Sequence, residues 1–132
     1  MLQHKTHYSI GEMCDEFGVT GRALRFYEDE ALISPERRGT QRLYTDRDRA
    51  RLAWILRGKR VGLSLAEIKE LLDLYDIGDD RRTQRLKTVE RCQGRVDSLK
   101  RQRIDIDATI KELEGFIALV KAQDDEQIPQ EK

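Results

Sequence analysis

Apolar side chains recur at alternating steps of three and four residues through the second half of the sequence. Nine of the ten positions in this repeat are apolar, and the ten are Val89, Cys92, Val96, Leu99, Arg103, Ile106, Ile110, Leu113, Ile117 and Val120. This spacing places a single apolar seam along one side of a helix. We therefore predict a helix from about residue 81 to residue 121 that has no core of its own and needs a partner helix.

The simplest partner for the seam is a second copy of the same chain. The β-branched residues Val89, Val96, Ile110 and Ile117 occupy alternate seam positions, which favours a two-stranded coiled coil in parallel models but leaves the orientation open. Arg103 is the one polar seam residue. It either fixes the register by pairing with an acidic residue of the second copy or extends its charged end into solvent.

The first part of the sequence predicts two short helices joined by a turn. Ser9–Glu12 forms a capping box that opens a helix, and Gly18 ends it. Thr20 caps the next helix, which carries Arg22 and Arg25 on one face and apolar residues on the other. A helix-turn-helix with a basic second helix fits a DNA major groove.

A small β-hairpin is predicted directly after the basic helix. Gly39 and Thr40 form the turn, and the strand-like stretch before and after it carries Arg37, Arg38 and Arg42. Such a wing can contact phosphates. The alternative is a charged loop that is simply solvated.

Two further helices complete the first domain. Thr45 caps a helix that we expect to run to about Val61, and its last turn carries Lys59 and Arg60. These two cations would suit the helix dipole alone, so their DNA role stays open at this point. A capping box at Ser64–Glu67 opens a short amphipathic helix to residue 75, followed by a break over residues 76–80.

Charge is distributed unevenly along a chain whose net charge is zero. Residues 20–63 contain eleven Lys and Arg against six Asp and Glu, which is the charge footprint of a DNA-facing surface. The chain shows no signal peptide and no apolar stretch of membrane-spanning length, so we expect a cytoplasmic, nucleoid-associated protein with reduced cysteines. We expect four segments: a disordered leader (1–8), a DNA-binding domain (9–76), a dimerisation helix (77–121) and a disordered acidic tail (122–132).

In the order of its elements and in four motifs, the chain resembles the MerR family of bacterial transcription regulators. The motifs are Tyr8-Ser-Ile-Gly-Glu12, Gly18-Val-Thr-Gly-Arg-Ala-Leu-Arg-Phe-Tyr-Glu28, Gly39-Thr-Gln-Arg-Leu-Tyr44 and Gly62-Leu-Ser-Leu-Ala-Glu-Ile68. The resemblance implies a mainly α fold, with a winged helix-turn-helix domain followed by a long helix that dimerises as a two-stranded coiled coil.

The resemblance also implies which side chains face DNA. The implied residues, including the helix cap, are Thr20, Arg22, Arg25, Phe26, Tyr27, Arg38, Arg42, Tyr44, Lys59 and Arg60. Phe26 stands where the family more often has tyrosine, so one hydroxyl is missing from this surface.

Family resemblance further implies a homodimer that binds double-stranded promoter DNA between the two polymerase elements and distorts the spacer so that RNA polymerase can engage. Cys92 occupies a seam position and lacks the companion cysteines of metal-sensing or redox-sensing relatives, so we expect no metal and no cofactor. The stretches Leu56–Gly62 and Leu74–Asp76 resemble short regulators of branched-chain amino-acid and fatty-acid catabolism. This makes an acyl-CoA a plausible effector, or leaves no effector at all.

Two other functions compete with DNA binding. The charged N-terminal domain could bind another protein, which would make the chain a coiled-coil interaction module. An enzyme is disfavoured, because the sequence offers no nucleophile–base pair, no glycine-rich phosphate loop and no paired catalytic acids.

Overall fold

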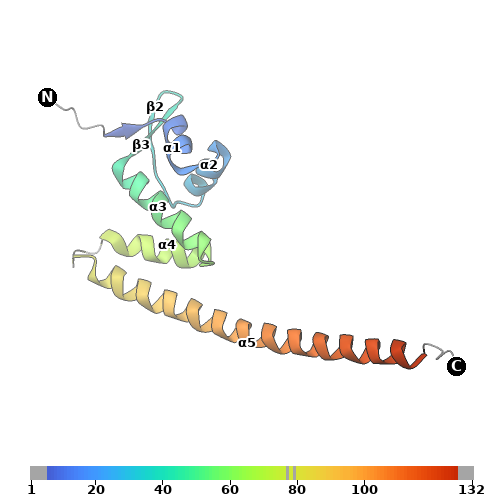
Figure 1. Ribbon diagram of the computed structural model, residues 1–132. Helices are drawn as coiled ribbons and strands as arrows, with labels where there is room; N and C mark the ends of the chain where they lie inside the picture. Colours follow the sequence, from blue (N-terminus) through green and yellow to red (C-terminus); the bar gives the residue numbers. More distant parts are fainter. Residues whose placement is uncertain (1–5, 77, 79, 128–132) are drawn as a thin grey trace. The chain divides into compact units, whose positions relative to one another are not determined.

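The structure is a computed structural model that describes residues 6–76, 78 and 80–127. It is mainly helical, with a small antiparallel sheet near the N-terminus and one long helix at the C-terminus (Figure 1). The predicted fold class, a winged helix-turn-helix followed by a long helix, is confirmed. By its internal contacts the chain divides into two compact units, residues 1–92 and 93–132.

The helix-turn-helix consists of α1 (Ile10–Phe17) and α2 (Gly21–Asp29). Both halves of the predicted capping box at Ser9 are present, and the Thr20 hydroxyl oxygen accepts a hydrogen bond from the Ala23 N–H at 3.1 Å. Gly18 ends α1 with a φ of 65°, the left-handed conformation that favours glycine. Local capping chemistry alone therefore fixes where both helices begin and where the first ends.

The wing consists of β2 (Glu36–Arg38) and β3 (Gln41–Thr45), and a third strand, β1 (His7–Tyr8), pairs with the other edge of β3. The expected leader is therefore wrong at residues 7 and 8, while residues 1–5 lie outside the described part of the chain. Side-chain contacts also hold β1: the Tyr8 hydroxyl donates to Asp46 Oδ1 at 3.0 Å, and His7 Nε2 lies 3.1 Å from Glu36 Oε2.

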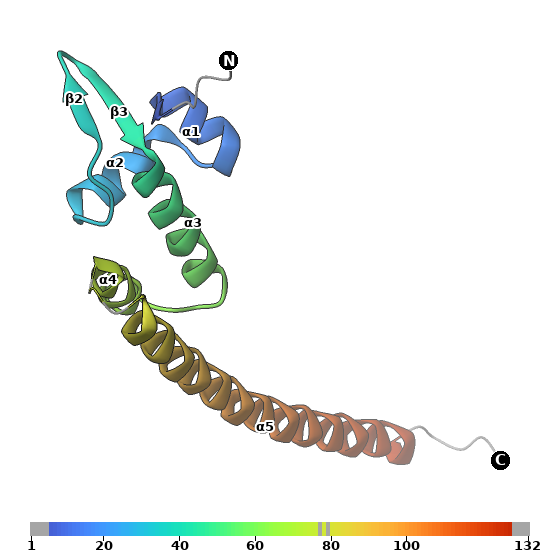
Figure 2. The same cartoon turned by 90° about the vertical axis from the view of Figure 1, so that its left-hand side faces the viewer.

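The helices α3 (Asp46–Arg60) and α4 (Leu65–Asp73) follow, and a single 3₁₀ turn, η1 (Leu74–Asp76), extends α4 (Figure 2). The capping residues Thr45 and Ser64 act as predicted. Gly58 permits the close approach of the two helices, because a Cβ atom there would lie 2.8 Å from Cγ1 of Ile68.

One apolar core joins the wing and the first four helices. Its fully buried members are Met13, Leu24, Tyr27, Leu32, Ile33, Tyr44, Leu52, Ile55, Ile68 and Leu72. This core fixes α2 against α1 and α3, so that the outer face of α2 is presented from a rigid support.

The long helix α5 spans Arg82–Gln127. Its first turns belong to the N-terminal unit: Gln84 Nε2 donates to the Leu71 carbonyl oxygen at 2.9 Å, and Arg91 Nη2 lies 2.7 Å from Glu70 Oε2. The expected disordered tail is wrong for residues 122–127, which continue the helix, and residues 128–132 lie outside the described part. Acidic side chains are compatible with a helix where no proline interrupts it, and Pro129 comes only after Gln127.

Candidate nucleic-acid interface

The exposed side of α2 carries Arg22, Arg25 and Phe26, which we call the basic face. Phe26 exposes 44% of its surface, whereas Leu24, on the inner side of the same helix, is completely buried. The helix period thus separates the two functions of α2, with packing on one side and two cations beside an aromatic ring on the other. Thr20 is exposed at the start of the helix, so its hydroxyl can act as both a cap and a donor to an anion.

Tyr27 belongs to the core rather than to the basic face. It is only 2% exposed, and its hydroxyl oxygen accepts a hydrogen bond from Lys59 Nζ at 3.1 Å. The Lys59 ammonium also lies 5.5 Å from the centre of the Tyr27 ring. The expectation that Tyr27 faces DNA is therefore corrected: it anchors α2 and holds Lys59, which is itself exposed, beside that helix.

Tyr44 is a second correction. Its side chain is completely buried, so it cannot reach a nucleic acid in this conformation. Among the described residues its hydroxyl has no hydrogen-bond partner. Burial raises the pKa of this hydroxyl, which stays protonated. Within β3 Tyr44 is the buried residue, and the adjacent Leu43 and Thr45 are only partly buried, as expected where alternate residues of a strand point to opposite faces.

The wing arginines are tied to the end of α2 by one carboxylate. Glu28 Oε1 lies 2.9 Å from Arg37 Nη2, and Glu28 Oε2 lies 2.8 Å from Arg42 Nε. Burial acts to raise the pKa of Glu28, but the hydrogen bonds from the two arginines outweigh burial and hold that pKa below its usual value. Arg42, predicted from the resemblance to face DNA, is thus already engaged within the domain.

Arg38 and Arg60 complete the expected set. Arg38 ends β2 next to the turn of the wing and is exposed, and Arg60 is exposed in the last turn of α3. With the basic face and Lys59, these residues give the N-terminal unit several exposed cations on α2, the wing and the end of α3.

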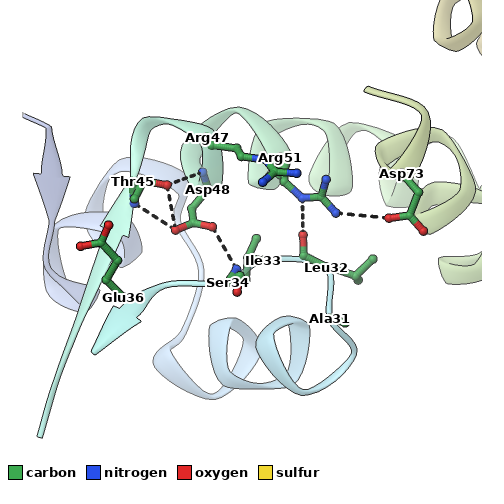
Figure 3. A pocket seen from close by; sticks show the side chains of 10 residues that line it. All are labelled: Ala31, Leu32, Ile33, Ser34, Glu36, Thr45, Arg47, Asp48, Arg51 and Asp73. Atoms are coloured by element: carbon green, nitrogen blue, oxygen red, sulfur yellow. Dashed lines mark hydrogen bonds and ion pairs between the residues drawn. The ribbon is translucent and has the colours of Figure 1, made fainter. Parts of the chain in front are cut away.

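A buried polar network holds the connection between α2 and β2 (Figure 3). Asp48 accepts hydrogen bonds from the Ser34 N–H at 3.0 Å and the Thr45 N–H at 2.9 Å. Arg51 donates through Nε to the Leu32 carbonyl oxygen at 2.6 Å and through Nη1 to the Leu72 carbonyl oxygen at 3.2 Å. These side chains line an open hollow of about 590 Å³ and satisfy backbone groups that packing would otherwise leave unpaired.

Arg49, on α3, contacts two further elements, α1 and β1. It bonds both carboxylate oxygens of Glu16 on α1, contacts the Tyr8 hydroxyl at 3.2 Å, and lies 4.5 Å over the Tyr8 ring. The hydrogen bonds from Arg49 lower the pKa of Glu16. The sequence pattern did not reveal this contact or the Glu28 contacts, because the partners lie 9 to 41 residues apart and no periodicity links them.

The seam of α5 is exposed in the single chain. Exposed fractions run from 40% at Val120 to 66% at Val89, while Cys92 is half-buried beside Trp54 and Val61 in a small apolar hollow of the N-terminal unit.

Within the described residues, no three His, Cys, Asp or Glu side chains are grouped to hold a metal ion. None of the described helices combines the length and the apolar character needed to cross a membrane.

A helix-turn-helix with a basic outer face and an arginine-bearing wing defines a winged helix-turn-helix protein. Comparison with known proteins identifies the family. Residues 8–74 match the family described as "MerR HTH family regulatory protein", and residues 49–116 match "MerR, DNA binding". The chain belongs to the MerR family.

Relatives and solved structures agree with this assignment. The chain is 32% identical to the HTH-type transcriptional regulator ZntR of Escherichia coli over 83% of this chain and 72% of that protein. It is 38% identical to HmrR of Rhizobium leguminosarum over 54% of this chain, and the match spans only 56% of the relative's length. The N-terminal part of MtaN, the Bacillus subtilis multidrug transporter activator, has a TM-score of 0.65 at 28% identity and covers 83% of this chain and 97% of that one.

One solved neighbour includes DNA. It is HiNmlR, a MerR family regulator lacking the sensor domain and bound to promoter DNA, with a TM-score of 0.58 and 27% identity over 87% of this chain and 86% of that one.

Proposed function

We propose that this protein is a homodimeric, sequence-specific DNA-binding transcription regulator of the bacterial cytoplasm. The observation that carries the proposal is the basic face of α2, which is exposed, rigidly supported by a closed core and accompanied by an arginine-bearing wing. A helix of this kind enters the major groove while the wing contacts the backbone alongside it.

The proposed DNA contacts are the exposed members of the predicted set. They are Thr20, Arg22, Arg25, Phe26, Arg38, Lys59 and Arg60. Tyr27 and Tyr44 support this surface from the core. Arg42 acts on the position of the wing through Glu28.

Dimerisation follows from the exposed seam of α5. Contact of the apolar seam side chains with water is unfavourable, and packing against the seam of a second copy removes them from water. A dimer also places two α2 helices at a fixed separation, which matches two half-sites of a pseudo-palindromic operator.

The action on transcription is proposed from the family resemblance. The dimer would bind a promoter spacer and bend or untwist it, which lets RNA polymerase engage. An acyl-CoA or a related metabolite is the proposed effector, since two short stretches resemble regulators of branched-chain amino-acid and fatty-acid catabolism.

Footprinting on the DNA upstream of the protein's own gene tests the main proposal. We expect protection of a pseudo-palindromic site, with an affinity that falls steeply as salt rises because phosphate contacts release counterions. Equal binding to every duplex, or no response to salt, would support the competing function of a protein-interaction module.

Arg25→Ala tests the role of the basic face. If Arg25 contacts a base, the substitution weakens operator binding by about 1–3 kcal/mol. Arg101→Ala is the matched control, since Arg101 is an exposed arginine of α5 outside the seam. An unchanged footprint and affinity for Arg25→Ala would remove this residue from the base-reading set.

A further inference from the structure

One carboxylate holds two arginines that face each other across the wing. Arg37 on β2 and Arg42 on β3 are paired directly opposite in the antiparallel register. Glu28 lies in the last turn of α2 and contacts each arginine through a different carboxylate oxygen, with Oε1 2.9 Å from Arg37 Nη2 and Oε2 2.8 Å from Arg42 Nε. The wing is therefore fastened to the basic helix by a single acidic side chain that bridges both strands.

Electrostatics explains why this position requires an acid. Two like charges directly opposite on neighbouring strands repel each other, and the carboxylate offsets that repulsion. The Glu28 side chain is only 18% exposed and that of Arg42 24%, whereas that of Arg37 is 54% exposed. Partial shielding from water makes these contacts stronger than those of an ordinary surface ion pair.

We propose that Glu28 determines DNA specificity: it withholds two wing arginines from indiscriminate phosphate contact and fixes the wing where the operator backbone can meet it. The proposal rests on the proposed DNA-binding function. An arginine bound to a carboxylate gains little from a phosphate, because it must first give up its partner. Only a duplex that contacts the basic face and the wing together gains enough binding free energy to offset the lost arginine–carboxylate contacts, so unrelated DNA is bound less tightly.

This role has a signature that a merely structural role lacks. Replacing Glu28 by the isosteric, neutral Gln frees both arginines, so the affinity for unrelated duplex rises. Its salt dependence steepens, with a slope of log affinity against log salt that changes by about 0.9 for each new phosphate contact. Operator affinity falls because the wing is no longer held. A domain that was only loosened would instead bind both duplexes more weakly.

Fluorescence anisotropy with the full chain measures the ratio of the two affinities. The probes are the footprinted operator duplex and an unrelated duplex of equal length, each titrated across a series of salt concentrations. We expect Glu28→Gln to lower the ratio of operator to unrelated affinity by about tenfold, the factor commonly contributed by a hydrogen bond to a charged group.

Glu30→Gln is the matched control. Glu30 caps the same end of α2 through its backbone, is exposed, and makes no side-chain ion pair with any described residue. The substitution Glu30→Gln removes the same charge from nearly the same place. If it raised the affinity for unrelated duplex as much as Glu28→Gln does, the effect would be due to net charge and the proposal would be overturned. Glu28→Asp keeps the charge, and we expect it to retain the wild-type affinity for unrelated duplex.

A second pair of variants covers the case in which Glu28→Gln does not fold, as judged by circular dichroism. Arg37 is held by Glu28, whereas its neighbour Arg38 makes no ion pair with a described residue. We expect Arg38→Gln to lower the affinity for unrelated duplex more than Arg37→Gln does. Equal losses in the two variants, or a larger loss for Arg37→Gln, would overturn the proposal.

The two proposals fail in different ways. If the wild-type chain binds no duplex, or binds all duplexes equally, the proposed function fails. If the wild type discriminates and Glu28→Gln discriminates equally well, the proposed function stands and only the role of Glu28 is lost.

Discussion

The two compact units of the chain place their apolar side chains in opposite environments. In the first unit, residues such as Leu24, Leu52 and Ile55 are completely buried within one chain. In the second unit, Ile110, which belongs to an equally regular helical pattern, is 46% exposed. The same helical periodicity thus yields a closed core in one unit and, in the other, an apolar surface that stays exposed in the described chain.

Polar groups differ in the same way. The first unit buries Asp48 and Arg51, and each has several hydrogen-bond partners from other elements. Buried polar groups of this kind specify one arrangement of the chain, because any other would leave them unpaired. In the second unit the single polar seam residue, Arg103, is exposed in the isolated chain, so it can specify an arrangement only if a second copy pairs with it.

Ile110→Asp gives the largest expected effect in this comparison. A charge at the middle of the seam has to be desolvated when two seams meet, so we expect monomers and complete loss of operator binding. Sedimentation velocity measures the association, and anisotropy measures the binding. Ala108→Asp places the same charge on the far side of α5 and leaves the dimer intact. A stable dimer of Ile110→Asp would show that our register of the seam is incorrect.

The same substitution placed in each unit sharpens the contrast. Leu52→Ala opens a cavity in the closed core and is expected to lower the free energy of unfolding by about 2–5 kcal/mol, whatever the protein concentration. Leu113→Ala removes a seam side chain that is 55% exposed in the single chain, so its effect acts through association: it is absent where both proteins are monomeric and reaches its full size where both are dimeric. Urea unfolding at several protein concentrations distinguishes the two, because the unfolding midpoint of a dimer rises with concentration; a loss for Leu113→Ala that persists at concentrations where the wild type is monomeric contradicts the proposed dimer.

Much of the fold could be predicted because its signals are local. The capping residues Ser9, Thr20, Thr45 and Ser64 bond to backbone groups within three residues, and each opens the helix that it was predicted to open. The long helix was predicted from its period alone, although its end lies at Gln127 rather than near residue 121. Helix ends without a strong stop signal are set by small differences in free energy that a pattern does not carry.

The candidate site was predicted less completely, because it depends on tertiary contacts. Arg22, Arg25 and Phe26 are exposed as expected, since helical spacing decides which side of α2 they occupy. Tyr27 and Tyr44 were assigned to DNA by resemblance, yet the core takes both. Glu28 contacts Arg37, which is 9 positions further along the chain, and Arg42, which is 14 positions further along. We call this pair of contacts the Glu28 clamp; no local sequence pattern marks it.

Acid is expected to weaken the first unit through Glu28. The pKa of Glu28 in the folded chain lies below its ordinary value of 4.5, so the unfolded chain takes up a proton more readily. The contribution of Glu28 to stability is present above pH 4.5 and is lost as the pH falls through the folded-state pKa.

Glu28→Gln should reduce the loss of unfolding free energy on acidification by about 1 kcal/mol or less, while Glu30→Gln should leave that loss unchanged. Thermal unfolding across an acidic pH series provides the measurement. Equal profiles for wild type and Glu28→Gln would show that the clamp does not contribute to folding.

Tyr44→Phe gives the smallest expected effect and tests whether Tyr44 supports the DNA-binding surface from the core or contacts DNA itself. The Tyr44 hydroxyl is buried and has no partner among the described residues, so removing it takes away a desolvation cost without breaking a hydrogen bond. We expect the free energy of unfolding to rise by about 0.5 kcal/mol, with operator affinity unchanged. Urea denaturation and anisotropy measure the two quantities on the same preparation. A loss of operator affinity with stability retained would return Tyr44 to the DNA-contacting set and require the wing to rearrange on binding.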